Sequence, residues 1–274
     1  MDDNGAGSEG NIVGKLKWTI SHCNQSVPYY QKLLEPHIVD GINLSDIFRV
    51  FGIAYADYLE FPDNQKNDPF RILAYPFYNM EKIVYDQNNH YVVGFSSGDI
   101  YCLGKISEEL LTYVGIKKFD TVLIQQGFDG IELGLKNLDV NTVVSDSADI
   151  ILELMSQVRA VIGDGNFIKK LIDNRLISRD TIIITNHSFV HECKFENSFY
   201  KIIDIGFGLG SGVGIINCKS GEVYFAEEYY YVEWEKFEDN RRKLIVTTLT
   251  MEATPLLRYK TNWFYEDKHF YYLT

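Results

Sequence analysis

The feature that most constrains the fold is a regular exchange of short apolar runs with segments of helical periodicity between Thr121 and Thr185. The apolar runs are Thr121–Ile124, Thr142–Val144, Ala160–Gly163 and Thr181–Ile184, and the helical segments are Ile131–Leu138, Ala148–Val158 and Phe167–Leu176. Strands that alternate with helices through short links pair in parallel and bury both faces under helices. This part of the chain therefore predicts a parallel sheet covered by helices.

The pattern changes near Lys201 to consecutive β-rich runs separated by turn signals such as Lys219-Ser220-Gly221. These runs are Ile202–Ile205, Val213–Asn217, Val223–Phe225, Tyr230–Trp234, Leu244–Leu249, Leu256–Lys260 and Phe270–Leu273. Strands joined without intervening helices pair antiparallel, so we expect an antiparallel, barrel-like subdomain here.

At the other end, the apolar residues from Ile12 to Phe61 recur at helical spacing, which predicts a helical N-terminal cap. Together the patterns predict an α/β chain in four parts. These are a flexible tail over residues 1–10, a helical cap and lead-in over 11–95, a parallel α/β subdomain over 96–200 and an antiparallel β subdomain over 201–274.

Charge and cysteine usage limit the partners and the compartment. The 274 residues carry a formal net charge of -12, which repels polyanions, so we expect neither nucleic acid nor an anionic membrane as a partner. The four cysteines show no paired spacing, the N-terminus has no secretory pattern, and no apolar run has the length of a membrane span. We therefore expect a soluble, cytoplasmic protein with reduced thiols.

The segment Leu244–Thr261, which reads LIVTTLTMEATPLLRYKT, resembles the strand-turn-strand signature of the phenylacetate-CoA ligase branch of adenylate-forming enzymes. Three other landmarks of that branch occur in the same order, at Val27–Leu34, Phe95–Gly98 and Glu222–Glu233. The resemblance covers residues from about 18 to 263 and extends to acyl-protein synthetases and coenzyme F390 synthetases. It implies the large N-terminal domain of such a ligase, without the mobile C-terminal subdomain.

Family members join a carboxylic acid to AMP and then to a thiol or another acceptor, and the resemblance places their phosphate-binding loop at Ser96, Ser97 and Gly98. In the family this loop is rich in Gly, Ser and Thr and ends in Gly-Lys, whereas here it continues with Asp99. An aspartate repels phosphate, so we expect a structural turn at this position rather than a phosphate site.

The other nucleotide landmarks are also altered. The turn that flanks adenine and supplies a magnesium-binding acid corresponds to Gly206, Phe207 and Gly208, and the position of the acid falls on Leu209 or Gly210. The signature continues from Arg258 through Lys260 to Trp263, where the family has the aspartate that grips the ribose hydroxyls. The resemblance therefore maps a nucleotide site whose ATP and magnesium contacts are mostly replaced.

Several other residues carry weaker signals, for which we favour structural roles. Glu227 and Glu228 could replace the missing acid but are expected to be exposed strand residues. The spacing of His187, His191 and Cys193 is compatible with zinc but more typical of packing residues, so we expect no metal site. Cys102 is expected to be a small buried hydrophobe, and the glycines from Gly206 to Gly214 a close-packed turn rather than a dinucleotide fingerprint.

These observations predict a degenerate homologue of an AMP-forming acyl- or aryl-acid ligase with no catalytic residue and no cofactor. We expect it to act through a retained acyl pocket or by binding a partner, such as a carrier protein or a ligase. The pocket is expected beside Gln126, Gly127, Phe128 and Gly208, because ligands of open α/β sheets bind beyond the carboxyl ends of strands. The alternative is an active ligase that uses ATP and magnesium through substitute residues or a C-terminal domain in trans.

Overall fold

The computed structural model describes residues 5–34, 72–74, 80–86, 91–146, 157–178, 180–186, 199–204, 212–236, 241–266 and 269–272. The chain divides into two compact units, one of residues 1–102 with 227–262 and the other of residues 103–226 with 263–274. Each unit is therefore assembled from segments that lie far apart in the sequence.

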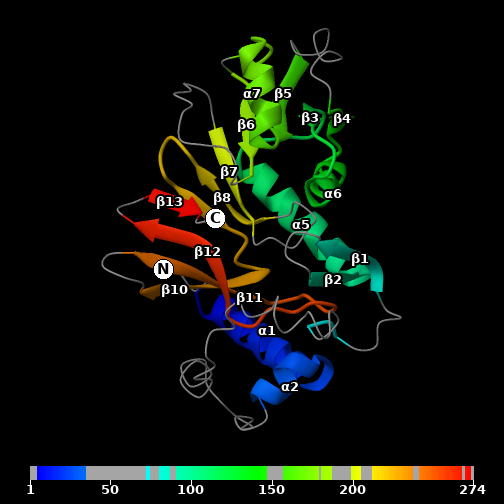
Figure 1. Ribbon diagram of the computed structural model, residues 1–274, viewed down its shortest axis with the longest axis vertical. Coiled ribbons are helices and arrows are strands. Elements are labelled where there is room, and N and C mark those ends of the chain that lie inside the picture. Colours follow the sequence, from blue (N-terminus) through cyan, green and yellow to red (C-terminus); the bar gives the residue numbers. More distant parts are fainter. Residues whose placement is uncertain are drawn as a thin grey trace. The chain divides into compact units, whose positions relative to one another are not determined.

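The second unit contains a seven-stranded sheet in the order β4-β3-β5-β6-β7-β8-β9 (Figure 1). Its strands are β3 (Thr121–Ile124), β4 (Asn141–Val144), β5 (Val158–Gly163), β6 (Ile182–Thr185), β7 (Phe199–Asp204), β8 (Gly212–Asn217) and β9 (Val223–Phe225). The pairs from β4 to β7 are parallel, and the pairs β7–β8 and β8–β9 are antiparallel. The predicted mixture of parallel and antiparallel strands is confirmed, although β7 still pairs in parallel with β6 and the direction changes only at β8.

The core of this sheet follows from the apolar runs that predicted it. Helix α7 (Gly165–Asp173) packs Phe167 and Leu171 in one buried cluster with Leu123, Val161 and Ile183. Helix α6 (Asp129–Asn137) follows β3 along the chain. The second half of strand β12 (Tyr259–Glu266) also belongs to this unit and pairs antiparallel with β13 (His269–Tyr272). The helix expected from residue 148 falls largely outside the described residues, and Val158 itself begins β5.

The first unit begins with helices α1 (Gly5–Ser26) and α2 (Pro28–Leu34), which occupy the described part of the expected helical cap. Their buried side chains Cys23, Val27, Tyr30 and Leu34 cluster with Ala74 and Leu257. Helix α1 starts at Gly5, inside the stretch that composition assigned to a tail, since adding turns to an existing helix costs less than starting one.

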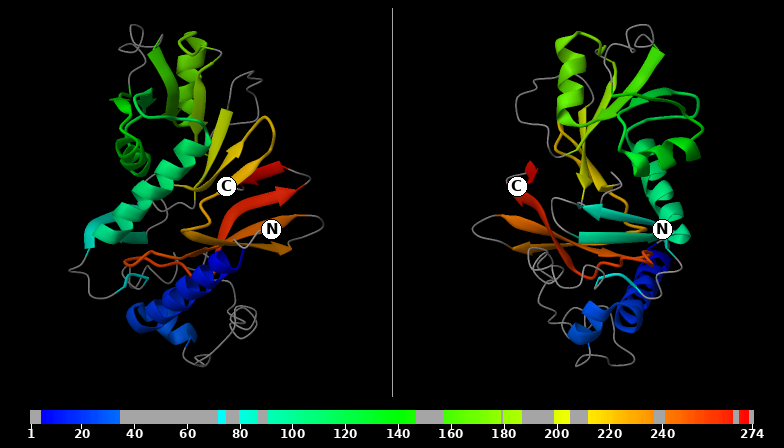
Figure 2. Two further views of the ribbon diagram at one scale, coloured as in Figure 1. Left: turned by 180° about the vertical axis from the view of Figure 1, so that it is seen from behind. Right: turned by 45° about the vertical axis from the view of Figure 1, so that its right-hand side comes forward.

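The rest of the first unit is β structure. The antiparallel hairpin of β1 (Met80–Asp86) and β2 (Tyr91–Ser96) runs directly into α5 (Ser97–Tyr113), whose first residues belong to this unit (Figure 2). Strands β10 (Tyr230–Lys236) and β11 (Arg242–Thr248) pair antiparallel beside the first half of β12. The β1–β2 hairpin was not expected from the sequence. Among the described residues, no helix combines the length and the apolar character that a membrane span requires.

Candidate functional site at the start of α5

The start of α5 is closed by reciprocal hydrogen bonds between Ser96 and Asp99. The Ser96 hydroxyl oxygen accepts a hydrogen bond from the backbone N–H of Asp99 at 3.0 Å, and Asp99 Oδ2 accepts one from the N–H of Ser96 at 2.9 Å. A capping serine paired with an acid three residues later satisfies N–H groups that the first turn of a helix leaves without partners. Ser97 and Gly98 lie between them as the first helical residues, so this segment forms a capped helix start.

The carboxylate of Asp99 also accepts hydrogen bonds from a distant segment. Oδ1 accepts a hydrogen bond from the N–H of Glu252 at 2.6 Å, and Oδ2 accepts one from the N–H of Ala253 at 2.9 Å. Asp99 therefore accepts three main-chain N–H bonds in all and is fully buried. Burial raises the pKa of Asp99 and the nearby Glu252 carboxylate adds to the rise, while the N–H donors oppose it.

Glu252 places a second carboxylate beside the same turn. Its Oε2 accepts a hydrogen bond from the Ser96 hydroxyl at 2.7 Å. A Cβ atom added to Gly98 would lie 3.1 Å from Oε2, so the carboxylate lies close to the turn where the phosphate loop was expected. Two acidic side chains thus occupy the surroundings of the capped turn, and they make it unfavourable for a phosphate group.

The segment that supplies these N–H groups belongs to the signature, and contacts from several elements hold it in place. The hydroxyl of Thr254 bonds both the N–H and the carbonyl of Gly94, at 2.9 and 3.0 Å. The N–H of Ala74 donates to the carbonyl of Ala253 at 2.8 Å. The ring Nε2 of His22 lies 2.6 Å from the carbonyl oxygen of Glu252. We refer to residues 249–258 as the signature loop.

The signature loop ends at Arg258, which makes an enclosed ion pair. Its Nε and Nη2 atoms donate to the two carboxylate oxygens of Glu233 at 3.0 and 2.9 Å, a bidentate arrangement. The side chains are 9% and 18% exposed, and burial raises the pKa of Glu233 while Arg258 opposes the rise. Arg258 has a φ of 51°, and its N–H donates to the hydroxyl of Thr247 at 2.9 Å.

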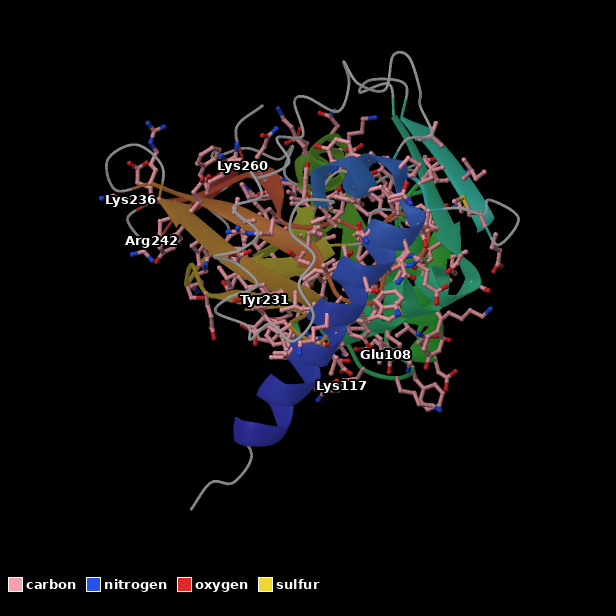
Figure 3. All side chains as sticks on the ribbon, turned by 90° about the horizontal axis from the view of Figure 1, so that it is seen from below. Glu108, Lys117, Tyr231, Lys236, Arg242 and Lys260 are labelled. Atoms are coloured by element: carbon pink, nitrogen blue, oxygen red, sulfur yellow. The ribbon has the colours of Figure 1, made fainter. Side chains whose placement is uncertain are left out.

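A second ion pair follows along the same strands, between Lys260 Nζ and Glu235 Oε2 at 2.7 Å. Figure 3 shows Lys260 on the sheet that carries Tyr231, with Lys236 and Arg242 at the far end of the β10–β11 hairpin. The described cationic side chains of the signature are thus engaged by acids of β10, so their charges are largely compensated within the sheet.

Trp263, at the position where the family has its ribose-binding aspartate, is a core residue of the second unit. Its side chain is 1% exposed, and Nε1 donates to the carbonyl oxygen of Asp204 at 2.7 Å. A buried indole normally finds such an acceptor. The residue contributes packing and one hydrogen bond, and it offers no carboxylate for a sugar hydroxyl.

The expected pocket segment follows β3 at the carboxyl edge of the parallel strands. Gln126 and Gly127 are exposed, Gly127 has a φ of 97°, and Phe128 is buried ahead of α6. The preceding Gln125 bonds Asp164 through both ends of its amide, donating from Nε2 at 3.1 Å and accepting the Asp164 N–H at 2.7 Å. The segment is therefore placed at a sheet edge, where ligands of such folds bind.

Several residues singled out from the sequence lie outside the described residues: Gly206, Phe207, Gly208, Leu209, Gly210, His187, His191 and Cys193. Glu227 and Glu228 are exposed as expected, but they lie in the turn before β10 rather than in a strand. Cys102 is half-buried rather than fully buried, and burial raises the pKa of its thiol, which disfavours the nucleophilic thiolate. The described part of the chain contains no group of three His, Cys, Asp or Glu side chains suited to a metal ion.

Sequence reasoning missed the partners of the altered positions. It treated Asp99 as a source of repulsion and did not foresee that its carboxylate bonds the signature loop. The spacing of Ser96 and Asp99 was a usable signal, since a serine followed three residues later by an acid marks a helix start. The pairing of Glu233 with Arg258 had no local signal, because it joins two strands that are not consecutive.

Comparisons with known proteins agree with this fold. The chain is 23% identical over 285 residues to the phenylacetate-coenzyme A ligase of Aromatoleum evansii, covering 90% of this chain and 63% of that protein. Its structure is similar to that of a 2-hydroxyisobutyryl-CoA ligase crystallised with 2-HIB-AMP and CoA, with a TM-score of 0.73, 12% identity and coverage of 93% and 64%. No family model matches the chain.

A weaker similarity links the fold to the o-succinylbenzoate CoA synthetase of Bacillus subtilis, with a TM-score of 0.53, 12% identity and coverage of 72% of this chain and 50% of that one. At such identities the structural similarity indicates the fold alone. The chain spans slightly less than two thirds of the length of the phenylacetate-coenzyme A ligase and of the 2-hydroxyisobutyryl-CoA ligase.

Proposed function

We propose that this chain, a homologue of phenylacetate-coenzyme A ligase with the fold of the large domain of adenylate-forming CoA ligases, does not bind Mg-ATP as those enzymes do. The observation that carries the proposal is the buried carboxylate of Asp99 beside the start of α5, which accepts the main-chain N–H groups of Ser96, Glu252 and Ala253. A triphosphate at this turn would face that carboxylate and the carboxylate of Glu252. The repulsion is strongest where water is excluded.

Two further observations support the proposal. Glu233 compensates the charge of Arg258, so this guanidinium is not free to neutralise phosphate. The ribose-binding aspartate of the family is replaced by Trp263, whose indole is part of the core. Loss of two charge-assisted hydrogen bonds to a ribose costs about 1.5 to 3 kcal/mol each, which is a tenfold or greater loss of affinity per bond.

We further propose that the chain acts by binding, with an acyl or aryl acid held beside Gln126, Gly127 and Phe128. Support comes from the exposed turn at the carboxyl edge of β3 and from the acid named in the relative, phenylacetate. A carrier protein or an active ligase would be the functional partner of such a binder. No ATP is consumed in this role, because the acid is held and not activated.

An ATP–pyrophosphate exchange assay with phenylacetate and related aryl acids tests the loss of activation. We expect no acid-dependent exchange, whereas exchange at the rate of an active ligase would favour the alternative of an enzyme with substitute residues. Binding of the same acids without nucleotide is measured by calorimetry. We expect Gln126→Ala to weaken it and the control Lys136→Ala, at an exposed position of α6, to leave it unchanged.

A further inference from the structure

Asp99 differs from an ordinary capping aspartate in the origin of its donors. Asp164, at the start of α7, accepts one main-chain N–H, from Phe167 at 2.8 Å, together with the side-chain amide of Gln125. Asp99 accepts three main-chain N–H bonds, of which two come from residues more than 150 positions away. The donors around Asp99 therefore form a cradle contributed by two separate chain segments.

This cradle is held in place by contacts that do not involve Asp99. Thr254 is fixed to Gly94, the carbonyl of Ala253 accepts from Ala74, and the carbonyl of Glu252 lies against His22. The Ser96 hydroxyl is tied to Glu252. Loss of the Asp99 side chain therefore leaves the N–H groups of Ser96, Glu252 and Ala253 in position and without an acceptor, which is costly for buried donors.

Building on the proposed function, we propose that Asp99 is the specificity-determining residue of this site. Its side chain is a tethered oxyanion that closes the cradle, and the cradle accepts a free carboxylate or phosphate once that side chain is removed. Replacement of aspartate by glycine deletes a CH₂–COO group, which matches acetate in size and charge. Acetate is therefore the closest free substitute, and inorganic phosphate is a larger probe of the same donors.

The neighbouring carboxylate sets the strength of this binding. Glu252 Oε2 lies beside the turn and repels any entering anion, as it repels the ionised Asp99. A free anion also lacks the covalent attachment that holds the Asp99 carboxylate beside its donors at a high effective concentration. We therefore expect binding in the millimolar range, detected as a shift in unfolding temperature rather than as tight association.

The experiment compares the unfolding temperature of Asp99→Gly in sodium acetate, in sodium phosphate and in sodium chloride of equal ionic strength. A saturable rise of roughly 2 to 4 °C in acetate over chloride is expected. Asp99→Ser, which keeps a short polar side chain and leaves room for an anion, is the second variant if the glycine variant folds poorly. Two control variants should show no rise of the unfolding temperature in acetate. Asp99→Asn keeps a side chain of the same size in the cradle, and Asp164→Gly deletes the same atoms at the other capping aspartate.

Absence of a rise in both Asp99→Gly and Asp99→Ser overturns the proposal. An equal rise in Asp99→Asn or Asp164→Gly overturns it as well, because it would reveal a general effect of anions on the fold. Calorimetry of the unaltered chain with Mg-ATP keeps the two proposals apart. Binding of Mg-ATP to the unaltered chain contradicts the proposed function. If the unaltered chain binds no Mg-ATP and the unfolding temperatures of Asp99→Gly and Asp99→Ser do not rise in acetate, only the proposed role of Asp99 is contradicted.

Discussion

In the described part of the chain, α5 and α7 each begin directly after a strand and carry an aspartate at their start, but the two aspartates make different contacts. Asp164 caps α7 and bonds atoms near it in the chain or on the adjacent strand end. Asp99 closes the first turn of α5 and also binds the signature loop. A residue type that normally stabilises a helix locally here also joins two segments that are distant in the sequence.

The difference shows that a buried carboxylate can connect a helix start to a distant loop. The main-chain donors around Asp99 are satisfied by its own side chain. Ser96, Asp99 and Arg258 are buried parts of the first unit, so their replacement should affect stability as well as binding.

Asp99→Ala removes the acceptor of three buried main-chain donors, and we expect it to lower the free energy of unfolding by about 3 to 5 kcal/mol. Asp164→Ala removes one local cap and should cost about 1 to 2 kcal/mol. Urea unfolding followed by circular dichroism measures both values. Equal losses of unfolding free energy would show that the hydrogen bonds between Asp99 and the signature loop do not add to stability.

The ion pairs offer a parallel comparison. Glu233→Gln leaves the buried guanidinium of Arg258 without its charged partner and should cost about 2 to 4 kcal/mol. Lys118→Ala breaks a pair with Asp139 whose side chains are 57% and 64% exposed, and it should cost at most about 1 kcal/mol. Thermal unfolding of both variants is the measurement. A larger loss for Lys118→Ala would contradict the assignment of Arg258 to an enclosed pair.

Stability should also respond to pH through Asp99. Burial raises its folded pKa above the ordinary value of 3.8, so the folded chain binds more protons than the unfolded chain between those two values. The contribution of Asp99 is therefore fully present below pH 3.8 and falls as the pH rises through the folded pKa. The stability difference between the unaltered chain and Asp99→Asn should shrink over this window in urea titrations. A stability difference that grows with pH would show that folding lowers the pKa of Asp99 instead of raising it.

Much of the fold was predictable because its signals are local. The apolar runs that became β3, β5 and β6 sit within a residue or two of their predicted limits, since buried parallel strands need continuous apolar side chains. In the missed β1–β2 hairpin, β1 mixes polar and apolar residues without strict alternation, whereas the apolar run of β2 was a usable signal. The change of strand direction was placed one strand early, since pairing direction depends on distant partners.

For the candidate site, the resemblance singled out several positions but did not indicate their hydrogen-bond partners. Ser96 and Arg258 match the family pattern that the sequence resembles, and Asp99 and Trp263 depart from it. Their hydrogen bonds to Glu252, Glu233 and Asp204 depend on long-range packing, which has no periodic signature. A familiar motif with one changed residue therefore identifies a place in the fold, while the structure gives the new role of that residue.

Calorimetric titration of the unaltered chain with Mg-ATP tests the central claim most directly, because the claim concerns binding of the nucleotide before any chemistry. We predict no saturable heat at nucleotide concentrations up to about 1 mM, with the chain shown to be folded in the same buffer. A dissociation constant of about 1 to 10 μM would contradict the claim. It would show that the carboxylates of Asp99 and Glu252 leave the nucleotide site open.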